Sequence, residues 1–99
     1  MADHQFENPL WKWGGKGSWH FVTVPEDISG IIRMSVPQKA GFGSAGVSAS
    51  IGGHRWKTSI FPDAKSGCYI LPVKAEIRKQ CNIKVGDVIP VSLDINGMG

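Results

Sequence analysis

The sequence of 99 residues predicts a mainly β fold, a small β-barrel of about six strands capped by two short helices. Three observations predict it. The apolar residues include 18 valines and isoleucines but only three leucines, and β-branched side chains suit a pleated sheet. Thirteen glycines and six prolines indicate many turns. Residues 69–93 change their hydrophobic period from two to about 3.6 and back, which indicates a strand, a basic helix and another strand.

Length and charge narrow the class of protein. We expect residues 1–99 to form a single domain, with residues 1–5 as a frayed terminus. The net charge of +3 is too small to indicate a nucleic-acid binder by itself. No apolar run approaches the ~20 residues that cross a bilayer, and the start lacks the regions of a signal peptide. Cys68 and Cys81 are therefore expected to be free thiols in a cytoplasmic protein without a membrane partner.

Three elements are predicted in the first third of the chain. Residues 6–13 and 19–24 read as strands, because their apolar and β-branched side chains lie between turn residues. Proline donates no hydrogen bond to a sheet, so Pro9 here and Pro90 in the last strand predict an edge or a bulge. Residues 26–34 predict a short helix with acidic residues at its start. The apolar face of this helix is formed by Ile28, Ile31 and Ile32.

The remainder predicts four more strands and a second helix. Apolar and small polar residues alternate in 47–51, and a Gly-Gly turn leads to a strand over 54–61. A short strand over 68–71 precedes a helix over 73–81, whose apolar positions are four residues apart. Residues 88–95 alternate as a final strand.

Two passages share one order of elements. Val22-Thr-Val-Pro25 and Ile70-Leu-Pro72 each end a strand and are each followed by a short helix, a loop and a strand. This order predicts two ββα-like halves about a pseudo-twofold axis. We therefore expect a fold complete within one chain, as a monomer or a weak homodimer.

A series of motifs resembles, in order, a known family. The motifs are Pro9-Leu-Trp11, Trp19-His-Phe-Val-Thr-Val-Pro25, Gly41-Phe-Gly43-Ser, Arg55-Trp-Lys-Thr-Ser-Ile-Phe-Pro62, Tyr69-Ile-Leu-Pro-Val73 and Gly86-Asp87. The chain resembles the bacterial family called domain of unknown function 1905. This resemblance implies a double-split β-barrel and brings no catalytic residues. A more distant likeness, through Pro72, Arg78 and Gly86-Asp87, is to AbrB-type swapped-hairpin regulators, in which the proline and the arginine are closer together.

No catalytic, cofactor or metal site is predicted. The run Gly41-Phe-Gly-Ser-Ala-Gly46 has the spacing of a dinucleotide fingerprint, but a strand follows it where the fingerprint needs a helix. The serines have no nucleophile motif around them. Side chains able to bind zinc lack the close pairs of structural sites. They are His4, His20, His54, Cys68 and Cys81.

The four tryptophans have two readings. Aromatic rings among basic residues stack bases over a positive groove, whereas most large aromatics in a small barrel fill the core. Strand alternation favours the core for Trp19 and Trp56. Trp11 and Trp13 share a face, and burial or exposure of that face is an even choice.

Basic residues supply a candidate ligand or nucleic-acid face. It consists of Lys74, Arg78, Lys79, Lys84, Arg55 and Lys57. A solvated polar helix face explains the same cluster, and Glu76 lies within it. We expect an uncharacterised, non-catalytic binding module with an unknown partner and at most weak nucleic-acid binding. An AbrB-like regulator that binds nucleic acid is the alternative, and an enzyme of unknown reaction is the third reading.

Overall fold

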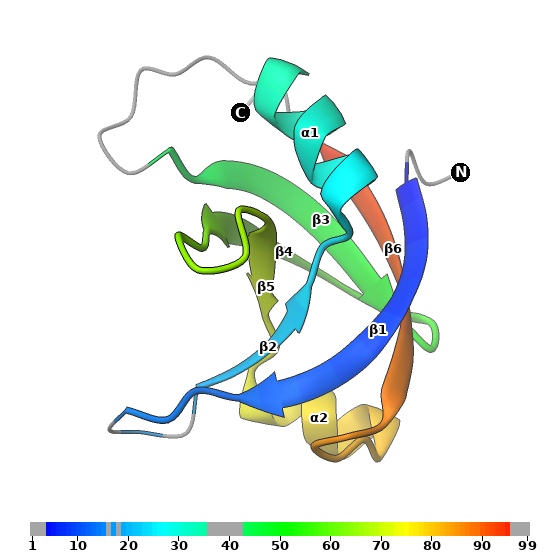
Figure 1. The fold of residues 1–99 in the computed structure, drawn as a ribbon. Coiled ribbons are helices and arrows are strands. Elements are labelled where there is room, and N and C mark those ends of the chain that lie inside the picture. Colours follow the sequence, from blue (N-terminus) through cyan, green and yellow to red (C-terminus); the bar gives the residue numbers. More distant parts are fainter. Residues whose placement is uncertain (1–3, 16, 18, 36–42, 96–99) are drawn as a thin grey trace.

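The computed structural model describes residues 4–15, 17, 19–35 and 43–95 of the chain. Within them lie six strands and two helices (Figure 1). In chain order these elements are β1 (His4–Lys12), β2 (His20–Thr23), α1 (Glu26–Ser35), β3 (Ala45–Ile51), β4 (His54–Pro62), β5 (Tyr69–Pro72), α2 (Ala75–Cys81) and β6 (Val88–Ile95). Neither helix in this part of the chain is long and apolar enough to cross a membrane.

The strands close into an antiparallel barrel in the order β1-β2-β5-β4-β3-β6, which confirms the predicted fold class. Two long strands change partners along their length. β1 pairs first with β6 and from Leu10 onward with β2, and β4 pairs first with β3 and from Phe61 onward with β5. Each change of partner splits the barrel wall at one place. α1 and α2 lie at opposite ends of the barrel (Figure 1).

The predicted halves are present. β2 and β5 pair antiparallel, with Val22 opposite Leu71, and each leads into a helix. Equivalent hydrogen bonds flank this pair of residues: the Val24 amide donates to Tyr69 O and the Val73 amide donates to His20 O, both at 2.9 Å. The strands of one chain therefore complete the barrel, with β2 and β5 meeting along the pseudo-twofold axis.

The strands form a closed barrel, so neither Pro9 nor Pro90 lies on the edge strand of an open sheet. Each proline instead occupies a place where its strand lacks a ladder partner on one side. Pro9 lies where β1 leaves β6 for β2. Leu10 donates its amide to β6-side Asp87, so the Pro9 nitrogen is directed to the β2 side. There, Asn8 Nδ2 donates to Thr23 O at 2.6 Å and supplies the donor that proline lacks. This side-chain amide seals the split between β1 and β2.

The missing N–H donor of Pro90 leaves no gap in the hydrogen bonding between strands, because of where this residue lies in β6. It lies in the part of β6 that pairs with β1, and the pairing of β6 with β3 begins only at Ser92. The predicted frayed terminus also needs correction. His4 and Gln5 pair with Leu93 and Ser92, so β1 begins at His4, and residues 1–3 are outside the described part.

The barrel interior is apolar. Its fully buried side chains include Leu10, Val22, Val47, Ile60, Leu71 and Leu93. Alternation thus predicted the inward residues of β3 and β6, where Val47, Ala49, Val91 and Leu93 are buried. Trp56 is partly buried and packs against this core, as predicted for that residue.

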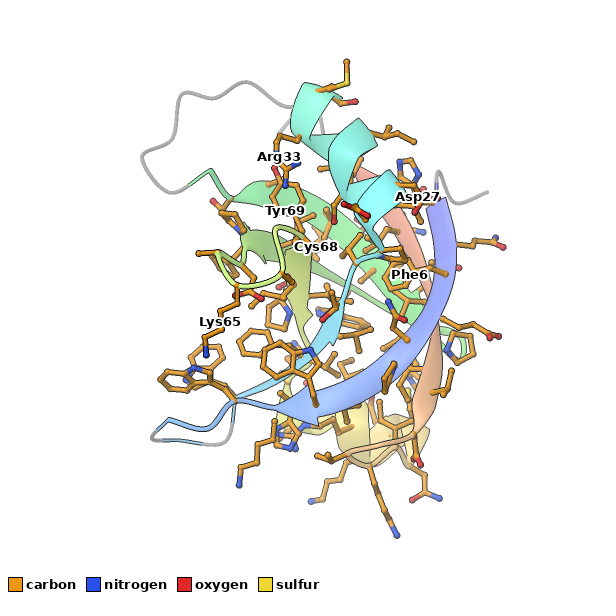
Figure 2. All side chains as sticks on the ribbon, viewed as in Figure 1. Phe6, Asp27, Arg33, Lys65, Cys68 and Tyr69 are labelled. Carbon is orange, nitrogen blue, oxygen red and sulfur yellow. The ribbon has the colours of Figure 1, made fainter. Side chains whose placement is uncertain are left out.

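Helix α1 closes one end of the barrel by a polar contact as well as an apolar one. Ile32 is buried, but Ile31 is half exposed, so the predicted apolar face is wrong at Ile31. Ser29 is buried instead: its Oγ donates to Val24 O and accepts from the Tyr69 amide, each at 3.0 Å. Arg33 extends over Tyr69, with Cζ 5.6 Å from the ring centre (Figure 2).

Helix α2 closes the other end. Ile77 is buried, and Asn82 ends the helix in the predicted left-handed conformation, with φ of 54°. The Asn82 amide bonds to carbonyl oxygens of the last turn.

Candidate functional site

The outer surface of β1, β2 and β4 carries exposed aromatic rings. Trp19 is 55% exposed and Trp13 47% exposed, while Phe61 is also exposed. The prediction that Trp19 is a core residue is therefore wrong. Val22 and Val24 of the same segment are fully buried, and alternation then directs Trp19 and Phe21 outward.

The same alternation settles the open question at β1. Leu10 is directed into the core, so Trp11 and Trp13 lie on the outer side. Trp11 is half-buried there, and its Nε1 donates to Thr23 Oγ1 at 2.9 Å. Trp13 folds back over Gly15, where a side chain would collide with the indole ring.

Phe21 connects these rings. Its centroid lies 5.0 Å from Trp11 in a tilted arrangement and 6.2 Å from Trp19, with those two rings nearly parallel at 8°. Such contacts fix the orientation of aromatic side chains. We call Trp11, Trp13, Trp19, Phe21 and Phe61 the aromatic face.

A cleft of about 480 Å³ adjoins the aromatic face, and we call it the Trp19 cleft. It lies at the second split of the barrel wall. β4 pairs with β5 only at Phe61 and Pro62, so the preceding residues of β4 stand apart from the end of β5. Thr58 and Ser59 line one side of the opening, and Pro72 lines the other. The corresponding split in the first half is the one that Asn8 seals.

The walls of the Trp19 cleft combine rings with positive charge. The aromatic members are Trp19, Trp56 and Phe61, and the cations are Lys57 and Lys74. Lys74 Nζ lies 3.8 Å from Glu76 Oε1, but both side chains are largely exposed. An exposed pair at this distance contributes little, so Lys74 retains most of its attraction for an anion.

His20 also lines the cleft. Its Nε2 lies 3.5 Å from Arg78 Nη1, and Arg78 Nε donates to Val73 O at 3.3 Å. Arg78 therefore stands behind the cleft wall and adds to its positive potential.

The basic residues singled out in the sequence separate in space. Lys57 and Lys74 line the Trp19 cleft, and Arg78 stands beside it. Arg55 pairs with Asp94 at 3.0 Å. Lys79 and Lys84 belong to α2 and the turn after it and do not line the cleft.

A second hollow, of about 320 Å³, lies next to the first. Trp19 and Phe61 line both hollows. Trp11, Trp13 and Phe21 complete the wall of the second, together with Ile70 and Asp63. The two hollows therefore adjoin along Trp19 and Phe61, with the lysines in the first and mainly aromatic rings, together with the Asp63 carboxylate, in the second.

Sequence reasoning missed the exposure of Trp19 and left that of Trp11 and Trp13 open. One signal was available: Trp13 and Trp19 flank the glycine-rich turn between the first two strands, and residues beside a turn are often on the surface. The Trp13 amide donates to Trp19 O at 2.9 Å, which places the two indole-bearing residues opposite each other.

Other reactive groups lie elsewhere. Cys68 and Cys81 are free thiols, and Cys81 Sγ donates to Ile51 O at 3.4 Å. Burial removes solvent from this sulfur and raises the pKa of the Cys81 thiol. Across residues 4–15, 17, 19–35 and 43–95, no three His, Cys, Asp or Glu side chains are placed to hold a metal ion. Residues 41 and 42 of the glycine-rich run lie outside the described part, and β3 begins at Ala45.

The raised pKa of Cys81 has a measurable consequence. Alkylation needs the thiolate. The rate of iodoacetamide labelling at Cys81 should therefore reach half its maximum at a pH above ~8.5, which is the pKa of an ordinary cysteine. Peptide mass spectrometry after timed labelling at increasing pH measures this rate separately for Cys68 and Cys81. A midpoint below that of a free cysteine peptide would contradict the burial argument.

Residues 6–93 match a family model whose description is domain of unknown function (DUF1905). No curated protein matches the chain.

Proposed function

This chain belongs to the family described as domain of unknown function (DUF1905), and we propose that it is a non-catalytic binding module whose ligand site is the Trp19 cleft. One observation carries the proposal: an indole 55% exposed, Trp19, forms a cleft wall together with Lys57 and Lys74. Clustered exposed aromatic rings commonly mark interaction sites, because isolated proteins usually bury such surface.

The polar groups of the cleft favour binding over catalysis. The described lining of the cleft contains two lysines and no carboxylate or cysteine, and the guanidinium of Arg78 lies beside His20. A lysine attracts the negative charge of an aromatic anion and an exposed ring stacks on its aromatic part, so these groups can bind such a ligand without a reaction.

The AbrB-like regulator has less support. Its likeness rests on Arg78, and this side chain donates to Val73 O and contacts His20 at the barrel wall. Lys79 and Lys84 do not line the cleft. We also propose a cytoplasmic monomer or weak homodimer, since one chain closes the barrel and both cysteines are free.

Binding of an aromatic anion tests the proposal. Anilinonaphthalene sulfonate should bind the folded protein saturably, with its fluorescence as the readout. Trp19→Ala should weaken that binding about tenfold, or roughly 1.4 kcal/mol, because the main exposed ring of the cleft is lost.

Trp13→Ala is the matched control, because Trp13 is similarly exposed but lines only the second hollow. It should weaken dye binding less than Trp19→Ala does. Equal effects of the two substitutions, or binding that never saturates, would count against the Trp19 cleft as the ligand site.

A further inference from the structure

We infer that the ligand of the Trp19 cleft is single-stranded nucleic acid, an inference that rests on the proposed function. It follows from the joint placement of stacking surfaces and cations across two adjoining hollows. Four features of the described surface support it. They are the exposed ring of Trp19, the two lysines of the cleft, the wall that both hollows share and the position of the other basic residues outside the cleft.

The first step concerns the bases. Trp19 lies nearly parallel to Phe21 at 6.2 Å, so its ring is held in a fixed plane while more than half of the residue remains exposed. Any of the nucleobases can stack on such a platform, since each base has a π-face. Trp56 and Phe61 flank the same opening and extend the apolar wall.

The second step concerns the phosphates. Lys57 projects from β4 and Lys74 from the start of α2, so the two cations border the cleft from separate elements. The described residues that line this cleft include no carboxylate. A ligand with an aromatic ring and a nearby negative charge therefore matches the wall better than a neutral sugar would.

The third step distinguishes a strand from a free nucleotide. The cleft does not end at Trp19, because the second hollow begins on the same ring and continues to Trp11 and Trp13. A chain of nucleotides that places one base in the cleft can place another against the second hollow. A mononucleotide would leave that aromatic wall uncovered.

The fourth step distinguishes a single strand from a duplex. The rings of the aromatic face are available only to bases that are not already stacked and paired. Duplex recognition relies instead on many phosphate contacts and on groups that enter a groove. Lys79 and Lys84, which would add to such contacts, lie outside the cleft.

The experiment measures fluorescence anisotropy of a labelled, mixed-sequence oligodeoxynucleotide of about 16 nucleotides, long enough for the site sizes of small single-strand binders. Trp19→Ala should weaken binding about tenfold or more, the loss expected for one stacked base. Trp19→Phe should recover part of the loss, since a smaller ring still stacks. Circular dichroism checks that each variant is folded.

Salt dependence tests the lysines separately. For single strands, the logarithm of affinity falls by about 0.7 per phosphate contact for each tenfold rise in salt. Lys57→Gln and Lys74→Gln should each reduce this slope by about 0.7, as one contact is lost. Lys79→Gln makes the same change of charge outside the cleft and should leave the slope unchanged.

Duplex DNA and a mononucleotide are tested as alternative ligands in the same anisotropy experiment. Duplex DNA bound as tightly as the single strand, or a mononucleotide that competes as well as the oligonucleotide per mole, would overturn the inference. No oligonucleotide binding alongside Trp19-dependent dye binding would overturn it while leaving the binding-module proposal in place. Failure of both ligands to bind would remove both proposals.

Discussion

Leu71→Ala should lower the free energy of unfolding by about 2–5 kcal/mol, the range for deleting a buried leucine side chain. Leu71 is fully buried on β5 and lies opposite Val22, where the two halves of the barrel meet. The packed interior has little freedom to collapse around the missing atoms, because strands of both halves converge on this point. Urea unfolding followed by circular dichroism measures the change.

Met34→Ala is the control for Leu71→Ala. Met34 is 90% exposed on α1, so its truncation should change the unfolding free energy by less than about 0.5 kcal/mol. The slope of free energy against urea should be similar in both variants if each unfolds in one step. A loss below about 1 kcal/mol for Leu71→Ala would show that β2 and β5 do not meet as described.

Ser29→Ala should cost about 1–3 kcal/mol, although it removes a single oxygen atom. The Ser29 hydroxyl accepts from the Tyr69 amide and donates to Val24 O, and the site is almost wholly buried. Alanine leaves both backbone groups without that partner, away from water. Thermal and urea unfolding should both report the loss.

Ser35→Ala separates this effect from the general cost of changing a serine in α1. Ser35 Oγ donates to Ile31 O at 2.8 Å, but the residue is exposed, so water replaces the hydroxyl. Its substitution should change stability by less than about 0.5 kcal/mol. Equal losses for Ser29→Ala and Ser35→Ala would mean that the buried hydrogen bonds contribute nothing.

The fold could be predicted from sequence because its strands alternate regularly. Val91 and Leu93 follow the period of a half-buried strand, and both are buried in the barrel. Alternation gives the two faces of a strand but does not say which face is inside. At Trp19 the usual burial of large aromatic side chains predicts the wrong face, because Val22 and Val24 fill the core instead.

The candidate site could be predicted only in part. Lys57 and Lys74 were both in the predicted basic face, but 17 residues separate them, and only barrel closure brings them to one cleft. Lys79 and Lys84 are nearer to Lys74 in the chain, yet they lie outside it. Proximity along a helix therefore does not by itself place cations at one cleft. Ser29 escaped notice because its role depends on Tyr69, 40 residues away.

The two splits of the barrel differ, and under the proposed function that difference would set the number of ligands that one chain binds. Duplicated halves would offer two equivalent slots, but Asn8 occupies the first with its own amide and leaves only the second open. Under the proposed function, each chain would therefore bind one ligand at this split. Many protein chains would then be needed to cover a long single strand. Each of them would bind the strand in the same direction along its cleft. A twofold-symmetric dimer of such chains would instead present two slots running in opposite directions.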